Sequence, residues 1–210
     1  VTGGGGLLVG TSLNADGTQT VRYHSEPVID FSWTASPRFR VATRQASGYE
    51  GKLEIAYLYL PEHAWTVDRV LAAADRAVGL YTAWYGDYPY PRLTLVDVPD
   101  DGQGAGGMEY PTLVTVGTLD VTGTGISLGP GDHTLEAVTV HEVGHQWWQS
   151  MVAFNEAEEP WLDEGFTEFS AVKVLDILYG SDRSYYDLPG LKVGAADMRR
   201  MEYLSMAPMP

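Results

Sequence analysis

Residues 141–145 read H-E-V-G-H and carry the side chains best suited to chemistry in this chain. On a helix, side chains four positions apart lie one above the other, so His141 and His145 could both reach one metal ion. Glu142 lies about 100° around the helix from His141 and could act on a water molecule bound to that ion. The pattern therefore predicts a helical metal site in which a carboxylate serves as general base.

A second segment offers a third ligand. Residues 161–166 read W-L-D-E-G-F, and eighteen residues separate His145 from Glu164. This span is long enough for a second helix to turn back and present the Glu164 carboxylate to the same ion. The chain has no cysteine, so His, Asp and Glu must hold any metal. Zn²⁺ suits imidazole and carboxylate ligands, and a catalytic zinc site keeps one position open for water.

The spacing H-E-x-x-H-x18-E resembles the gluzincin metallopeptidases, and specifically the M1 aminopeptidase family. Residues 106–109 read G-G-M-E and resemble the G-x-M-E-N exopeptidase motif of that family, which also lies about thirty residues before the first histidine. Residues 88–91 read Y-P-Y-P and are similar to the end of the family pattern F-G-x-P-Y-P. Together the matches cover roughly residues 50 to 180.

The resemblance implies a role for each matching residue. His141, His145 and Glu164 would hold one zinc ion per chain, and Glu142 would be the general base. Glu109 would bind the free α-amino group of a peptide, so that the bond next to the N-terminus lies over the metal. The implied reaction is zinc-dependent hydrolysis that removes N-terminal residues.

Further residues near these motifs have expected roles. Extended backbone at Gly106, Gly107 and Met108 could pair with the substrate as an added strand. Glu168, one turn beyond Glu164, could accept a hydrogen bond from a ligand histidine, or could simply be a structural helix residue. Tyr110 stands where the family motif usually has Asn.

The elements that must position these residues follow from hydrophobic periodicity. Short apolar or alternating runs before Pro61 predict β-strands, and Gly3–Gly6 reads as a flexible end. After Pro61, apolar residues recur at three- and four-residue steps, as in an amphipathic helix. The sequence predicts helices over about 67–85, 135–150 and 162–178, and further strands at 93–98 and 113–116.

This order favours an α+β fold rather than alternating βαβ units. With the resemblance, residues 1–50 are expected to be the C-terminal part of an N-terminal β domain, and residues 51–210 a truncated, thermolysin-like catalytic domain with a mixed sheet and active-site helices. The chain is then expected to be a fragment of a longer protein. The transition-state-stabilising tyrosine of the family is expected beyond residue 210.

Composition narrows the range of partners. The 28 acidic residues against 13 Lys and Arg give a formal charge of −15, which would repel nucleic acid and anionic membrane surfaces. No apolar stretch approaches the roughly 18 residues that span a bilayer. We therefore expect no nucleic acid partner and no membrane contact from this segment. The expected partner is a peptide substrate.

Other functions are less consistent with the motifs. A metzincin would need Gly and His where this chain has Trp148 and Met151. Residues 102–107 satisfy G-x-G-x-x-G, but an extended run at 113–116 follows instead of the helix that a nucleotide site requires. Two alternatives stay open. One is an endopeptidase, and the other is a catalytically incomplete module that binds a peptide or partner and retains zinc.

Overall fold

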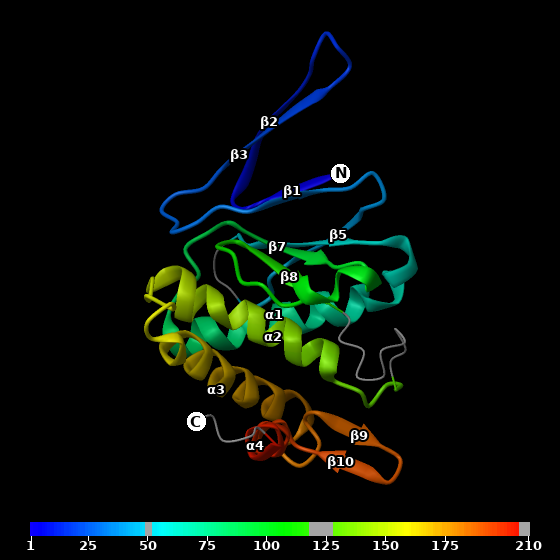
Figure 1. Ribbon diagram of the computed structural model, residues 1–210, viewed down its shortest axis with the longest axis vertical. Coiled ribbons are helices and arrows are strands. Elements are labelled where there is room, and N and C mark those ends of the chain that lie inside the picture. The colour runs from blue at the N-terminus through cyan, green and yellow to red at the C-terminus, as the bar shows by residue number, and fades with distance from the viewer. Residues whose placement is uncertain (49–51, 118–127, 206–210) are drawn as a thin grey trace.

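A four-stranded mixed sheet lies at the centre of the fold (Figure 1). The computed structural model describes residues 1–48, 52–117 and 128–205. Strand β5 runs antiparallel to β6, whereas β6, β7 and β8 are parallel to one another. The strands, in their order across the sheet, are β5 (Arg40–Gln45), β6 (Glu54–Tyr59), β7 (Arg92–Asp97) and β8 (Leu113–Val116).

Strands β6 and β7 are joined by helix α1 (Val67–Tyr85), which follows a 3₁₀ turn at Pro61–Thr66. The helix buries Val70, Leu71 and Tyr81 along one stripe, as the periodicity predicts. The β6–α1–β7 connection with parallel strands is a βαβ unit. The α+β interpretation holds for the whole arrangement, but it overlooked this unit, because the parallel pairing of β6 with β7 is a contact between distant segments.

Two consecutive helices cover the same side of the sheet as α1 (Figure 1). They are α2 (Thr134–His145) and α3 (Pro160–Tyr179). The predicted single helix over 135–150 is wrong at its C-terminal end, since Gln146–Met151 forms a π-helical turn (η3). The fully buried Gln146 side chain explains why this turn is held: its Oε1 accepts hydrogen bonds from the Thr112 N–H at 2.8 Å and the Tyr88 hydroxyl at 3.3 Å. Such turns are frequent at functional sites.

The N-terminal residues form small ladders on the opposite side of the sheet. Here Gly3 and Gly4 belong to strand β1, so the expectation of a flexible end is wrong. A Cβ at Gly3 would meet the Leu58 side chain at 2.7 Å, which shows how closely this strand packs. The ladders are β1 (Thr2–Gly4) with β4 (Trp33–Ala35), and β2 (Leu7–Leu13) with β3 (Gln19–His24).

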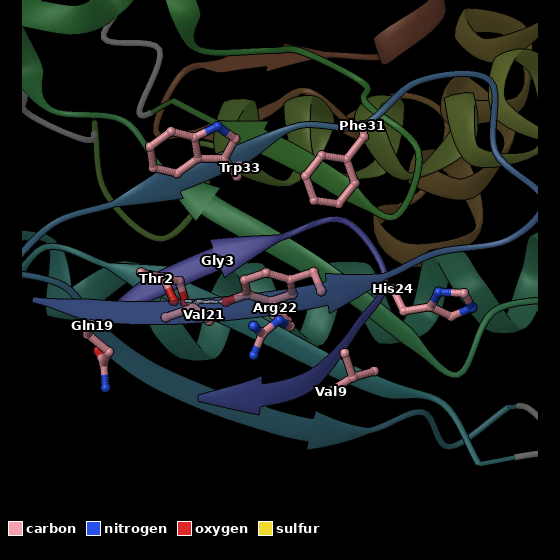
Figure 2. A pocket seen from close by; sticks show the side chains of 10 residues that line it. Thr2, Gly3, Val9, Gln19, Val21, Arg22, His24, Phe31 and Trp33 are labelled. Atoms are coloured by element: carbon pink, nitrogen blue, oxygen red, sulfur yellow. Dashed lines mark hydrogen bonds between the residues drawn. The ribbon is translucent and has the colours of Figure 1, made fainter. Parts of the chain in front are cut away.

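A groove of about 630 Å³ lies among these ladders. Figure 2 shows Phe31 and Trp33 on one side of it and Val9 and Val21 on the other. Trp33 is 69% exposed. The groove is therefore a hollow of the N-terminal ladders that both apolar side chains and polar ones such as Gln19 and Arg22 line.

After α3, a short hairpin leads into the last described helix. The hairpin is β9 (Tyr186–Leu188) with β10 (Leu191–Val193), and the helix is α4 (Ala195–Ser205). Helix α4 packs against α3. A 3₁₀ segment at Asp100–Ala105 (η2) leads from β7 toward the residues of the G-G-M-E motif.

The central sheet crosses the predicted domain division. Strand β5 lies within residues 1–50 but pairs along its whole length with β6. The division at residue 50 stays a prediction, and the sheet includes one strand from before it. In the described ranges, none of the helices is both long and apolar enough to cross a membrane.

Candidate metal centre

Helices α2 and α3 bring three ligand-type side chains to one point. His141 and His145 face α3 from the last turn of α2, and Glu164 faces them from the first turns of α3. The two histidine Nε2 atoms are 3.0 Å apart. The Glu164 Oε2 atom lies 3.2 Å from the His141 Nε2 and 3.7 Å from the His145 Nε2. Helical spacing and the short connection together produce this convergence.

Each histidine has a carboxylate partner on its other ring nitrogen. The Nδ1 of His141 lies 3.0 Å from Glu168 Oε2, and the Nδ1 of His145 lies 2.5 Å from Asp163 Oδ1. With Nδ1–H donated to a carboxylate, a neutral imidazole presents its Nε2 lone pair to the centre. Glu168 therefore lies where a histidine acceptor is expected.

The sequence interpretation missed Asp163. This residue precedes Glu164, is only 2% exposed, and accepts from a histidine that is itself 1% exposed. The sequence signal that could have found it is its position directly before Glu164, the expected third ligand. A buried carboxylate needs a partner, and His145 is the partner here.

The donor set fits a tetrahedral zinc ion. Zinc takes imidazole and carboxylate ligands at about 2.0–2.2 Å, which places neighbouring ligand atoms about 3.3 Å apart. The three separations of 3.0, 3.2 and 3.7 Å among the Nε2 atoms and the Glu164 oxygen lie around that value. Two imidazole Nε2 atoms that face each other beside a carboxylate oxygen are, once both are deprotonated, the arrangement that a divalent cation would stabilise.

Protonation of the metal-free site agrees with this arrangement. Burial lowers the pKa of His141, but its hydrogen bonds to Glu164 and Glu168 outweigh burial and raise the pKa to about 10. The hydrogen bond to His141 lowers the pKa of the Glu164 carboxyl. A metal ion would thus replace a proton at the Nε2 of His141, as expected for metal ligands.

Glu142 is buried beside the convergence point without a partner for one oxygen. It is 5% exposed, and its Oε2 has no hydrogen-bond partner in the described ranges. Burial raises its pKa to about 7, and the charges of Glu109 and Glu164 add to that rise while the two histidines oppose it. Gly107, at φ +108°, leaves room for it, because a Cβ there would lie 3.1 Å from Glu142 Oε1.

The G-G-M-E segment borders the same site. One carboxylate oxygen each of Glu109 and Glu142 and a ring nitrogen of His145 lie within 4.8 Å of one another. Burial raises the pKa of Glu109. The Met108 carbonyl accepts a hydrogen bond from the Thr115 N–H at 2.8 Å, which fixes the segment to the edge strand β8.

A cavity of about 100 Å³ opens next to Glu109. The Tyr110 side chain packs against the small apolar cluster around Leu58 and Leu113. The Tyr110 carbonyl accepts from Gln146 Nε2 at 3.2 Å, so the segment is tied to the π-helical turn. The cavity is lined by Ile29, Asp30, Met108, Glu109, Tyr110, Pro111, Gln149 and Glu156.

Glu142 should make the stability of the metal-free protein depend on pH. Its pKa is near 7 in the folded state and near 4.5 when unfolded, so between these values only the folded state holds the proton. Raising the pH through this window therefore destabilises the folded state, by on the order of 2–3 kcal/mol. Urea unfolding at pH 4.5 and pH 8 measures the effect, and Glu142→Gln should lack that part of it. If Glu142→Gln changes the free energy of unfolding by the same amount at both pH values, the raised pKa of Glu142 would be contradicted.

Comparison with known proteins decides the family. The model of the peptidase family M1 domain matches residues 71–203, which include both helices of the site and the G-G-M-E segment. This chain belongs to peptidase family M1. The resemblance inferred from the motifs is thereby confirmed.

Several M1 relatives share part of this chain. Human aminopeptidase B is 33% identical over 120 residues, which cover 57% of this chain and 16% of the relative. The tricorn protease-interacting factor F2 of Thermoplasma volcanium is 29% identical over 104 residues, 49% of this chain and 13% of the relative. Bovine endoplasmic reticulum aminopeptidase 2 is 28% identical over 125 residues, 58% of this chain and 13% of the relative. The chain thus matches only a small part of each relative.

Proposed function

We propose that this M1 chain carries the zinc site of an aminopeptidase, a hydrolase that removes N-terminal residues from peptides. The observation that supports it most is the convergence of His141, His145 and Glu164, with Glu142 and Glu109 beside them. Such a reaction needs three metal ligands, a general base and a group that binds the substrate. The buried Glu142 carboxylate, whose Oε2 has no partner within the described residues, suits the base, and Glu109 suits the binding group. Relatives named as aminopeptidases add support.

The proposed division of labour follows the geometry. His141, His145 and Glu164 hold the metal, while Glu168 and Asp163 orient the two imidazoles. A bound zinc ion would polarise the carbonyl of the scissile peptide bond and acidify water next to it. Glu142 Oε2, which has no partner within the described residues, takes the proton from the attacking water and passes it to the leaving amine.

Glu109 would select the free N-terminus. Its carboxylate lies at the edge of the metal site and can pair with an ammonium group by a charge-assisted hydrogen bond. Such a fixed contact places the first peptide bond over the metal. We propose further that Gly106, Gly107 and the Met108 N–H line the substrate backbone, since the Met108 carbonyl is already paired with Thr115.

Replacing Glu109 should test the aminopeptidase assignment. In the complete gene product that contains these residues, Glu109→Gln is expected to lower kcat/KM for peptides with a free N-terminus by about 10²-fold, the scale of a lost charged contact of 2–3 kcal/mol. Peptides whose N-terminus is acetylated should be poor substrates of the wild type. Glu158→Gln, at an exposed position between α2 and α3, is the control and should leave both rates unchanged.

The same assay separates the alternatives. Equal cleavage of free and acetylated peptides would indicate an endopeptidase. No cleavage of either by a zinc-loaded protein would indicate the binding module.

A further inference from the structure

Helix α4 contacts the metal site through one arginine. The Nε of Arg199 donates a hydrogen bond to Glu168 Oε1 at 2.5 Å. The other oxygen of this carboxylate, Oε2, lies 3.0 Å from the Nδ1 of His141. A single carboxylate therefore joins the guanidinium of α4 to a proposed metal ligand of α2. Figure 1 shows α4 beside α3, on the side of the molecule away from the sheet.

Arg199 is itself held in place. Its Nη1 donates to Glu202 Oε2 at 2.7 Å, one turn along α4. The guanidinium also lies 5.7 Å from the centre of the Tyr185 ring. The planar fork of arginine can serve two carboxylates at once, which a lysine ammonium does with less geometric precision. Arg199 is thus an anchored contact, unlike a freely moving surface side chain.

The two histidines differ in how their carboxylate partners are held. Asp163 is short and 2% exposed, so burial alone restricts it against His145. The Glu168 side chain is 27% exposed and has one more rotatable bond. Fixing a glutamate side chain costs up to about 2 kcal/mol of rotamer entropy. A second partner therefore restricts the Glu168 side chain more than it would restrict Asp163, and Arg199 is that partner.

We propose that Arg199 is a positioning residue that holds Glu168 against His141 and so couples α4 to the metal site. Arg199 acts through Glu168, because no hydrogen bond or ion pair joins Arg199 to the proposed metal ligands within the described residues. The inference rests on the metal site proposed above. It assigns to α4 a role in zinc affinity in addition to its packing on α3.

Zinc affinity of the complete gene product tests this proposal. Competition with a chelator at fixed pH gives the zinc Kd, and circular dichroism of the metal-free protein reports folding. Partners of ligating histidines typically contribute 10- to 100-fold to metal affinity. Arg199→Gln should fall at the low end of that range, with Kd about 10-fold weaker. Arg199→Lys should give an intermediate Kd, about 3-fold weaker.

Two controls lie on the same helix. Arg200→Gln makes the same change in a side chain that is 73% exposed and forms an ion pair with Asp197, away from Glu168, and it should leave Kd unchanged. Glu202→Gln removes the charge of the other carboxylate that Arg199 contacts but keeps the Glu168 contact, so it should have a smaller effect than Arg199→Gln.

A double-mutant cycle isolates the path through Glu168. In a Glu168→Gln background, Arg199→Gln should no longer change the zinc Kd. An unchanged Kd in the single variant, or the same loss in both backgrounds, would overturn the proposal. Should Arg199→Gln fail to fold, Arg199→Lys decides: a Kd equal to wild type would overturn it. A wild type that binds no zinc would instead refute the metal site itself.

Discussion

The Glu142→Gln variant is expected to lose about 10³-fold in kcat while it retains zinc, because general acid–base catalysis typically contributes 10²–10⁴-fold. Glutamine has nearly the shape of glutamate, so the buried position beside Gly107 stays filled. The amide cannot take a proton from water. The loss should therefore appear in kcat, with KM little changed.

Two measurements on the complete gene product check this expectation. Peptide hydrolysis gives kcat, and metal analysis after dialysis gives the zinc content. Glu158→Gln removes one carboxylate from the exposed loop between α2 and α3 and should behave as wild type. Turnover that persists in Glu142→Gln would show that another group is the base.

Replacing the proposed metal ligand Glu164 should have the second large effect. Glu164→Ala is expected to weaken zinc binding by at least about 100-fold, since each ligand of a zinc site accounts for a few kcal/mol of the binding free energy. The Glu164 side chain is 59% exposed, so its truncation leaves no cavity in the core and the fold should be preserved. Activity should fall with zinc occupancy.

Chelator competition measures this loss, and a thermal melt without metal separates it from unfolding. Glu158→Ala is the matched control, because it truncates an exposed glutamate just before α3. Zinc affinity that is the same in Glu164→Ala and wild type would exclude Glu164 from the ligand set.

Helix geometry and hydrophobic periodicity explain which features could be predicted from the sequence. The stacking of His141 over His145 follows from helix geometry, and Glu168 follows from Glu164 by one further turn. The amphipathic pattern after Pro61 predicted helix α1, and the continuous apolar run at 93–98 predicted the buried strand β7. Each of these features follows from residues that are close to one another in the sequence.

Features that depend on distant parts of the chain escaped prediction. Asp163 and Arg199 matter because α2, α3 and α4 pack together, and no periodicity marks either residue. The π-helical turn depends on Gln146, whose partners Tyr88 and Thr112 come from other segments. Gly3 and Gly4 read as a flexible end because their close packing against Leu58 and Tyr23 is invisible in the sequence.

X-ray absorption at the zinc edge, on the zinc-loaded complete gene product, would show whether His141, His145 and Glu164 bind zinc. We expect one zinc ion per chain, with two imidazole nitrogens and carboxylate or water oxygen at about 2.0–2.2 Å. The Glu164→Ala variant should lose that ion or change its coordination. Zinc that does not bind at this stoichiometry, or a spectrum without the scattering of two imidazole rings, would contradict the proposed zinc site.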